Sequence, residues 1–554
     1  MKPVVEKIKV HLIAILSVLL GLLLSLFVLY TPTPKTADTE GSFSAVRAAA
    51  HIEQISRKPH SYYDQVELEE VRVYLEETLK DYLGNANVTR YTYDVNEVEI
   101  MIGETLPYDL VNLVGKIEGR NEEGILILAH YDSRGHVGRA GELGRSFGAM
   151  DDGYGVGSLL ELAYIFKDLE LENSIYFLFT DAEEVGLYGA KVAAIDPRIV
   201  GQVKFVINLE SRGRYGPAYM FETSKGNEKV INLYTKAKLP VTYSMATAVY
   251  SVMPNSTDFT PFIEADFPGL NFATLAGIDN YHSPLDAYEN INLSSIQHMG
   301  TQVEPVIREF VSQSRYVEND YFKATNDQVF FTLLPGVLIH YSQAVAVILV
   351  IVLVLGLAGY LFVTIKQKTF TKETFTKTLP KGLALTLGLV VTGYLFSRIV
   401  AFLGKAPFSL TYTRVSGFDF ITLLFMVVML LGFKLFARKA EQNRVLLIGV
   451  IINLLLTILT TFTLPGASFL FAVASLFGLV GLFTDYLANK WVKHPLYAIS
   501  YIIQLLIIIP LLYSFYMALT VGGTAILVLL LVINLSVTVP LINKHIRLEK
   551  VMTE

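Results

Sequence analysis

The sequence predicts an α/β domain with a largely parallel mixed sheet flanked by helices, joined to an all-α multi-span transmembrane domain. Its formal net charge of −6 is unevenly spread: residues 1–30 carry +2, residues 31–327 carry −19 and residues 328–554 carry +11. Long apolar runs are confined to the two outer parts. In the middle part, short apolar runs alternate with polar turns and helical stretches, which is typical of an α/β layered fold.

Composition excludes several classes of protein. The C-terminal part is far poorer in charged residues than a soluble domain, so the chain is not a single soluble globule. The acidic middle part is a poor match for nucleic acid, and no nucleic-acid partner is expected. The chain has no cysteine, which excludes disulfides, thiolate metal ligands and cysteine nucleophiles. The lack of cysteine also favours a bacterial cell membrane over a eukaryotic organelle as the location.

The apolar runs predict an integral, multi-pass membrane protein with the lipid bilayer as a partner. Residues 11–30 are long enough to cross a bilayer, so residues 1–30 are predicted to be a retained anchor and not a cleaved signal peptide. Residues 328–554 are predicted to contain about seven more helices, at 343–365, 383–404, 417–436, 445–463, 467–486, 496–516 and 520–541. The stretch Val329–His340 contains Pro335 and is too short to cross alone, so it is expected to be interfacial or a disputed extra span.

The loop charges predict the orientation. Alternate loops carry fourteen Lys and Arg residues, whereas the opposite loops carry only Lys405 and Arg414. Because basic loops stay in the cytosol, both termini are expected there, and residues 31–327 lie on the other side. This arrangement requires eight spans.

The middle part contains four apolar runs that are predicted to be buried strands: Gly124–Ala129, Ser174–Thr180, Val203–Leu209 and Leu270–Leu275. Asp152–Asp168 is predicted to be a helix with a glycine-rich start. Strands that alternate with helices favour parallel pairing. In such sheets, ligands collect at the carboxyl ends of the strands.

Polar residues follow these strands. The segments are His130-Tyr131-Asp132, Asp151-Asp152, Asp181-Ala182-Glu183-Glu184, Asn208-Leu209-Glu210 and Tyr281-His282-Ser283. Two histidines and several carboxylates match the nitrogen and oxygen ligands of a catalytic zinc site. Taken singly, each segment is weak evidence for a metal site, because a lone histidine is more often structural and a lone acid is usually a solvated charge. The ordered set is much harder to obtain by accident.

The order HYD, GAMDD, DAEE, NLE and YHS resembles the co-catalytic di-zinc aminopeptidases of the aminopeptidase Y type. The anchor and the multi-span C-terminal part are similar in layout to the vacuolar membrane protease and endoplasmic-reticulum metallopeptidase branch. For a eukaryotic chain, this resemblance implies the membrane of the vacuole or the endoplasmic reticulum. The motif resemblance covers about residues 40–315. It implies a zinc peptidase domain at 31–327 and an exopeptidase of peptide substrates that binds two Zn²⁺ per chain. An aminopeptidase is the first choice, with carboxypeptidase and dipeptidase action left open.

The resemblance also implies a role for each motif residue. Five residues are implied as metal ligands: His130, Asp151, Glu184, Glu210 and His282. Within that set Asp151 bridges the two metals. Glu183 is implied as the general base, and Asp132 as the group that orients the His130 ring. Family members often have an aspartate where Glu210 stands.

Three alternatives stay open at this point. An inactive peptidase-fold scaffold would have lost a ligand or the base, yet all are present. A glutaminyl-cyclase-like enzyme would work with a single zinc. A transport function in the membrane part lacks support, because Arg398, Asp419 and Asp485 lie near the ends of the predicted spans. The oligomeric state does not follow from the sequence.

Other residues near the motifs have more than one interpretation. The loop Ser133–Phe147, with Arg134, Arg139 and Arg145, is expected either to be flexible or to contact a substrate carboxylate. Tyr281 either donates to a developing oxyanion or packs in the core. His136 is not expected to be a ligand, and Asp258 is given no catalytic role.

Overall fold

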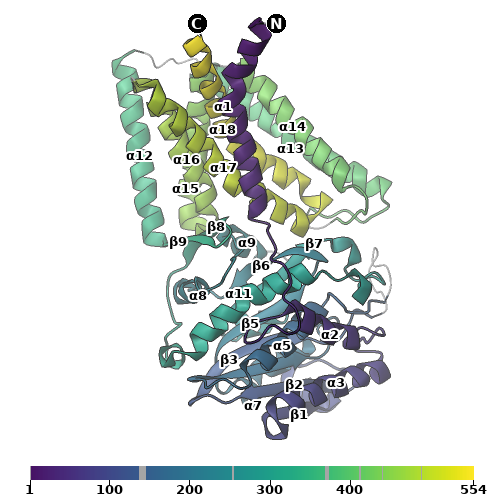
Figure 1. Ribbon diagram of the computed structural model, residues 1–554. Coiled ribbons are helices and arrows are strands. Elements are labelled where there is room, and N and C mark those ends of the chain that lie inside the picture. The colour runs from purple at the N-terminus through teal and green to yellow at the C-terminus, as the bar shows by residue number, and fades with distance from the viewer. Residues whose placement is uncertain are drawn as a thin grey trace. The chain divides into compact units, whose positions relative to one another are not determined.

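The computed structural model describes residues 2–135, 145–251, 255–368, 374–410, 413–439, 441–487 and 489–553. The chain separates into two units (Figure 1). The α/β unit comprises Leu29–Gln328 and Pro335–Leu338, and the helical unit comprises Met1–Val28, Val329–Leu334 and Ile339–Glu554. The predicted boundaries at residues 30 and 327 lie close to these divisions.

The α/β unit is built on a seven-stranded mixed sheet, which confirms the predicted fold class. In spatial order its strands are β1 (Val88–Tyr93), β2 (Leu110–Ile117), β4 (Asn173–Thr180), β3 (Asn121–His130), β5 (Val203–Ser211), β7 (Gly269–Ala276) and β6 (Tyr215–Thr223). The four central strands β4, β3, β5 and β7 are parallel and contain the four predicted runs. The outer strands pair antiparallel.

Helices cover both faces of the sheet. One face packs against α5 (Gly153–Phe166) and α11 (Leu293–Val311), which Figure 1 shows in front of the strands, with α2 (Ala45–Ile55) against α5. The other face packs against α6 (Tyr188–Ile195) and α10 (Phe259–Glu264) in one apolar cluster. The remaining helices are α3 (Gln65–Leu83), α4 (Val95–Ile102), α7 (Pro197–Val200), α8 (Glu228–Tyr234) and α9 (Ser244–Tyr250).

Burial on both faces explains the sequence of the central strands. Every residue of β4 is buried, as expected for a strand covered by helices on both sides. Residues of β3 alternate between the two faces, and Leu126 and Leu128 belong to the cluster with α6 and α10. On the opposite face, the Phe205 ring of β5 lies 6.0 Å from that of Phe310 in α11. The core therefore holds the carboxyl ends of the parallel strands rigidly.

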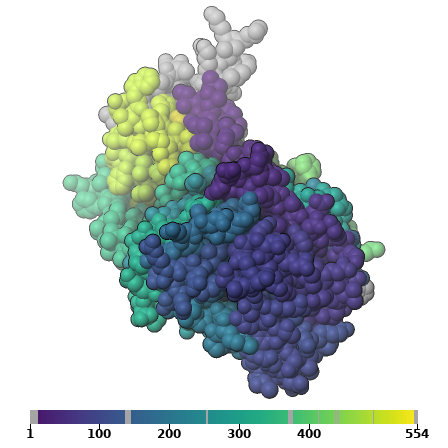
Figure 2. Space-filling model, turned by 60° about the horizontal axis from the view of Figure 1, so that its bottom comes forward, coloured from purple at the N-terminus to yellow at the C-terminus, as the bar shows by residue number. Residues whose placement is uncertain are grey.

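The segment before β2 forms much of the outer surface of the α/β unit. Figure 2 shows this purple to dark blue part of the chain over much of the face in view. Helix α3 buries Leu68, Val71, Leu75 and Leu79 at the three- and four-residue spacing of one helix face. Its exposed side carries the charged Glu70, Glu77 and Asp81 as well as Val66 and Val73, so the helix gives no continuous apolar run in the sequence.

The helical unit contains α1 (Lys2–Phe27) and seven further helices: α12 (Gln343–Lys366), α13 (Leu379–Leu403), α14 (Asp419–Lys439), α15 (Gln442–Thr463), α16 (Ser468–Phe483), α17 (Lys490–Leu519) and α18 (Thr524–Thr553). Among the described residues, six segments are long and apolar enough to cross a membrane, namely Gln343–Lys366, Thr376–Leu403, Gln442–Thr463, Pro465–Tyr486, Trp491–Leu519 and Val521–Arg547. Leu12–Phe27 is a shorter apolar helix. The eight-span topology stays a prediction.

The stretch Val329–His340, which is expected to be interfacial or a disputed extra span, is not a helical span; its interfacial position stays a prediction. It forms a two-stranded sheet of β8 (Gln328–Leu334) and β9 (Val337–Ser342). Pro335 and Gly336 connect the strands, and Gly336 has a φ of 74°. Glycine adopts this left-handed conformation without a steric penalty, so Pro-Gly is a turn signal that outweighs the apolar composition.

Candidate metal centre

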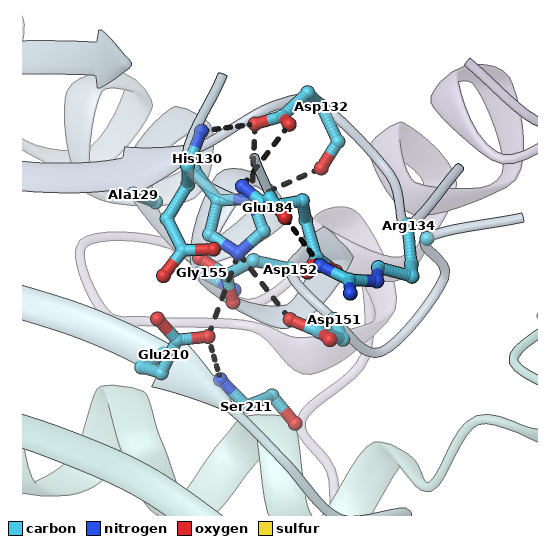
Figure 3. A network of polar contacts seen from close by, with 12 residues as sticks. Ala129, His130, Asp132, Arg134, Asp151, Asp152, Gly155, Glu184, Glu210 and Ser211 are labelled. Atoms are coloured by element: carbon cyan, nitrogen blue, oxygen red, sulfur yellow. Dashed lines mark hydrogen bonds and ion pairs between the residues drawn. The ribbon is translucent and has the colours of Figure 1, made fainter. Parts of the chain in front are cut away.

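His130 and Asp132 lie where β3 ends. The His130 Nδ1 atom lies 3.0 Å from the backbone oxygen of Asp132 and 3.4 Å from its carboxylate (Figure 3). The Asp132 carboxylate also accepts the backbone N–H groups of Glu183 at 3.0 Å and Glu184 at 3.3 Å. Asp132 therefore joins the segment after β3 to the segment after the neighbouring strand β4, and it fixes the His130 ring with its Nε2 edge toward the other motifs.

Asp151 lies between the two histidines. Its Oδ1 atom is 3.3 Å from His130 Nε2, and its Oδ2 atom is 3.2 Å from His282 Nε2. The side chain comes from the turn before α5, where Asp152 caps the helix by accepting the Gly155 N–H. One carboxylate with an oxygen toward each histidine has the geometry of a bridging ligand.

Around Asp151 the structure brings together two groups that could each hold a metal ion. One group is His130, Asp151 and Glu210, and the other is Asp151, Glu184 and His282. In each group the candidate ligand atoms lie within 4.8 Å of one another. His130 Nε2 is 3.6 Å from Glu210 Oε1, and His282 Nε2 is 3.1 Å from Glu184 Oε2. These are the five residues that the sequence motifs identify.

The donor set fits divalent zinc. Nitrogen from histidine and oxygen from carboxylates are both zinc ligands, with one histidine, one terminal carboxylate and the shared Asp151 in each group. Glu184 Oε1 is buried and has no hydrogen-bond donor among the described residues. Buried carboxylate oxygens without donors are costly unless a cation is close, so the site suits bound metal ions.

Burial of so many acids shifts their protonation. Burial raises the pKa of Glu184 and Glu210, and the neighbouring acids add to the shift. For His130, burial opposes protonation, but the carboxylates of Glu183 and Glu210 outweigh it and raise its pKa well above the usual value. An acid cluster that holds protons in this way releases them when divalent cations bind.

Tyr281 stacks on the ligand candidate His282. The ring centroids lie 3.6 Å apart with an interplanar angle of 21°. Burial, and then the nearby carboxylates of Asp151 and Glu184, raise the pKa of Tyr281 well above its usual value. Its hydroxyl therefore stays protonated, as both an oxyanion donor and a packed core tyrosine require.

The long loop contributes one arginine to the site. Arg134 donates a hydrogen bond to the backbone oxygen of Glu184, and the same nitrogen lies 3.3 Å from Glu184 Oε2. Arg145 at the other end of the loop pairs with Asp64. Arg139 and His136 lie outside the described residues. Among the described residues of this loop, Arg134 is therefore the arginine that lies nearest the metal ligands.

Asp286 is a site residue that the sequence motifs missed. Its carboxylate accepts the Ser146 O–H at 2.6 Å, the Met150 N–H at 2.6 Å and the Asp151 N–H at 3.4 Å. It follows His282 by four residues, so it ties the segment of one ligand to the turn that carries the bridging ligand. No metal-ligand pattern includes Asp286, and only its position after YHS points to it.

Asp258, which is given no catalytic role, lies close behind one of the motif segments. It is fully buried, accepts the Thr180 O–H, and burial raises its pKa to about 7. Thr180 is the last residue of β4, directly before the DAEE segment. The contact places Asp258 behind that segment and outside both metal groups.

Replacing Asp286 by asparagine is expected to weaken metal binding more than it destabilises the fold. An amide offers one oxygen acceptor, so the turn of Asp151 loses at least one buried hydrogen bond, at a cost of about 1–3 kcal/mol. Zn²⁺ retained per chain against a competing chelator measures the effect. Asp168→Asn, at an exposed position after α5, is the matched control. Unchanged zinc retention in Asp286→Asn would contradict the role.

Comparisons with known proteins find relatives of this chain. Residues 112–307 match the profile of peptidase family M28. A vacuolar membrane protease of Candida dubliniensis is 28% identical over 464 residues, which cover 78% of this chain and 47% of that protein. Endoplasmic reticulum metallopeptidase 1 of Homo sapiens is 26% identical over 368 residues, which cover 63% and 40%. The chain thus spans about half the length of the curated relatives it matches.

Solved structures also align with the α/β part. A zinc aminopeptidase of Bacillus subtilis aligns with a TM-score of 0.39 at 15% identity, over 50% of this chain and 97% of that one. A glutaminyl cyclase of Porphyromonas gingivalis aligns with a TM-score of 0.38 at 19% identity, over 48% and 98%. The sequence match is therefore the finding that points to a family: residues 112–307 match the model of peptidase family M28, in a chain that also carries helices long and apolar enough to span a membrane.

Proposed function

We propose that this chain is a membrane-anchored, zinc-dependent exopeptidase, and specifically an aminopeptidase that binds two zinc ions. The observation that carries the proposal is the pair of ligand groups that share Asp151. A single-zinc enzyme has no need of a second histidine and a second acid on the far side of the same carboxylate. The name of the fungal relative, a vacuolar membrane protease, supports peptide substrates.

In the proposed mechanism His130, Asp151 and Glu210 would hold one zinc ion, and Asp151, Glu184 and His282 would hold the other. Bound zinc supplies a Lewis acid that polarises the peptide carbonyl and lowers the pKa of water. The protein's own residues supply the proton transfers and the positioning.

Glu183 is the proposed general base. It lies next to Glu184, and its backbone N–H is fixed by Asp132. Burial raises the pKa of Glu183 well above its usual value. A carboxyl group with a raised pKa can take a proton from water and then give it to the leaving amine. The Tyr281 hydroxyl donates to the oxygen that becomes negative in the transition state.

The aminopeptidase preference rests on charge. The part of the chain from 31 to 327 carries a net charge of −19. An acidic surface attracts the cationic end of a peptide more than its carboxylate end. Arg134 favours the alternative. It is a basic residue beside the site, 3.3 Å from Glu184, and a basic group at this place can bind the terminal carboxylate of a substrate of a carboxypeptidase or dipeptidase.

A peptide-library assay on the detergent-solubilised full-length chain tests the proposal. We expect residues to be lost from the free amino end, no cleavage of N-acetylated peptides, full inhibition by a chelator, and two zinc ions per chain by elemental analysis. Release from the carboxyl end would replace aminopeptidase by carboxypeptidase action. One zinc per chain with cyclisation of N-terminal glutamine would identify a glutaminyl cyclase instead.

The topology and the domain limits belong to the same proposal. We infer from the loop charges that residues 31–327 form an extracytoplasmic peptidase domain, with both termini and the basic loops in the cytosol. Protease added to intact cells should then cleave within residues 31–327. Protection of that part would overturn the orientation.

A further inference from the structure

The helical unit contains an apolar groove of about 300 Å³. Residues of α12 and α16 form most of its lining, and Leu496 of α17 lies at one end. Its lining includes Val352, Gly356, Leu476, Leu479, Phe483 and Leu496. Thr484 is the one polar side chain among the lining residues.

The groove offers an apolar surface, and its one polar lining side chain is already hydrogen-bonded within the protein. The Thr484 hydroxyl donates within the protein, at 2.6 Å from the Gly481 oxygen and 2.5 Å from the Tyr497 hydroxyl. The walls face outward, since Val352 is 54% and Leu476 41% exposed, whereas Leu353 and Leu479 below them are buried. All three helices are among those able to cross a membrane. The occupant must therefore be a hydrocarbon chain that reaches the groove from the bilayer.

One end of the groove lies near basic residues at the connection between two membrane helices. Its last lining residues are Thr484, Leu487 and Leu496, at the connection between α16 and α17. The loop charges place this connection in the cytosol. Lys493 precedes Leu496 by three residues, so both lie on one face of α17, with Lys493 about one turn nearer the cytosol. The nearby acid, Asp485, pairs with Lys544 at 2.9 Å.

We propose that this groove binds an acyl chain of an anionic phospholipid of the cytosolic leaflet, with its headgroup at Lys493. The cytosolic leaflet supplies anionic lipids, and a lysine near the membrane surface attracts them. The lysine stem can extend along the apolar wall while its ammonium group reaches the headgroup. The inference is independent of the peptidase activity.

The size of the groove argues against a protein occupant. A helix with its side chains is about 10–12 Å across. A space of about 300 Å³ is at the lower end of small-molecule pockets and does not accommodate a helix from a second copy. An extended hydrocarbon chain fits both the volume and the lining.

The single tryptophan of the chain is a built-in probe. Trp491 is 77% exposed and lies two residues before Lys493. The full-length chain is placed in phosphatidylcholine nanodiscs that contain a small fraction of brominated phosphatidylglycerol or, separately, brominated phosphatidylcholine. Quenching of Trp491 fluorescence then reports which lipid lies beside it. We expect an apparent preference of about fivefold for the anionic lipid at low salt, the effect of one lysine.

Two variants test the two parts of the proposed site. At Gly356 an added Cβ would lie 3.2 Å from the Leu479 side chain, so Gly356→Leu fills the groove. Gly359→Leu on the same helix is its control, because nothing lies within 4 Å of an added Cβ there. Lys493→Gln removes the headgroup contact, and Lys381→Gln, an exposed lysine at the start of α13, is its control.

Loss of the anionic preference in Gly356→Leu and Lys493→Gln, with both controls unchanged, is the expected result. Equal quenching by the two lipids in the unsubstituted chain would overturn the proposal. So would a preference that survives Lys493→Gln, which keeps the groove intact and does not depend on how Gly356→Leu folds. If a brominated free fatty acid quenches Trp491 as strongly as brominated phosphatidylglycerol does, the ligand is a fatty acid and not a phospholipid.

Discussion

Replacing Glu183 by alanine is expected to abolish peptide hydrolysis while the zinc content stays near that of the unsubstituted chain. Glu183 belongs to neither metal group, although it is adjacent to Glu184, which does. Loss of a general base costs about 10²–10⁴ in rate. Steady-state hydrolysis of a free-amino-end peptide, together with zinc per chain by elemental analysis, measures both effects on one preparation.

The neighbouring residue is the matched control. Glu184→Ala removes a candidate ligand, so it should lose zinc from the group of Asp151, Glu184 and His282 along with activity. Glu183→Gln keeps the backbone N–H that donates to Asp132 and the size of the side chain, and removes only the proton acceptor. Loss of both zincs in either Glu183 variant would show that Glu183 is a ligand and not the base.

The parallel centre of the fold could be predicted from the sequence because helices bury those strands on both faces. Burial forces a continuous apolar run, and each run is followed by polar residues at the carboxyl edge, where the motifs lie. The edge strands β1 and β6 carry no such signal. β1 is largely half-exposed, and β6 begins with Tyr215, Gly216 and Pro217, which are poor indicators of a strand.

The supporting residues of the site could not be predicted for a different reason. Asp286 acts on a turn 135 residues earlier in the chain, and nothing local marks that contact. The ligands themselves are recognisable because metal chemistry restricts their residue types. Groups that act through hydrogen bonds to backbone have no such restriction, so their role appears only when distant segments are brought together in the fold.

Behind the candidate metal centre, a buried ion pair stabilises the same edge of the sheet. Arg72 of α3 contacts Asp181 through Nη2 at 2.6 Å, and both side chains are almost fully buried. Arg72 Nε also donates to the Tyr131 hydroxyl at 2.8 Å. Tyr131 and Asp181 lie within the HYD and DAEE segments, so one arginine connects the two strand ends that carry His130 and Glu183.

Replacing Arg72 by methionine is therefore expected to destabilise the α/β unit by about 3–5 kcal/mol, because it leaves the Asp181 carboxylate buried without its counter-charge. Burial already raises the pKa of Asp181 to about 6, even though Arg72 opposes the shift. Without Arg72 that pKa rises further, so the unfolded chain releases the proton more readily than the folded one. The variant should then regain part of its stability as the pH falls from 8 toward 5.

Pulse proteolysis in urea on the full-length chain measures this loss, and two further variants isolate its cause. Arg72→Met combined with Asp181→Asn removes the unpaired charge and should recover a large part of the stability, which a simple packing defect at Arg72 would not allow.

Arg120→Met is the matched control, since Arg120 is 73% exposed and its contacts with Glu170 and Glu172 are at 3.8 and 3.5 Å. Its cost should stay below about 0.5 kcal/mol. A double variant as unstable as Arg72→Met alone would show that the arginine acts through its hydrogen bond to Tyr131 and not through the charge of Asp181.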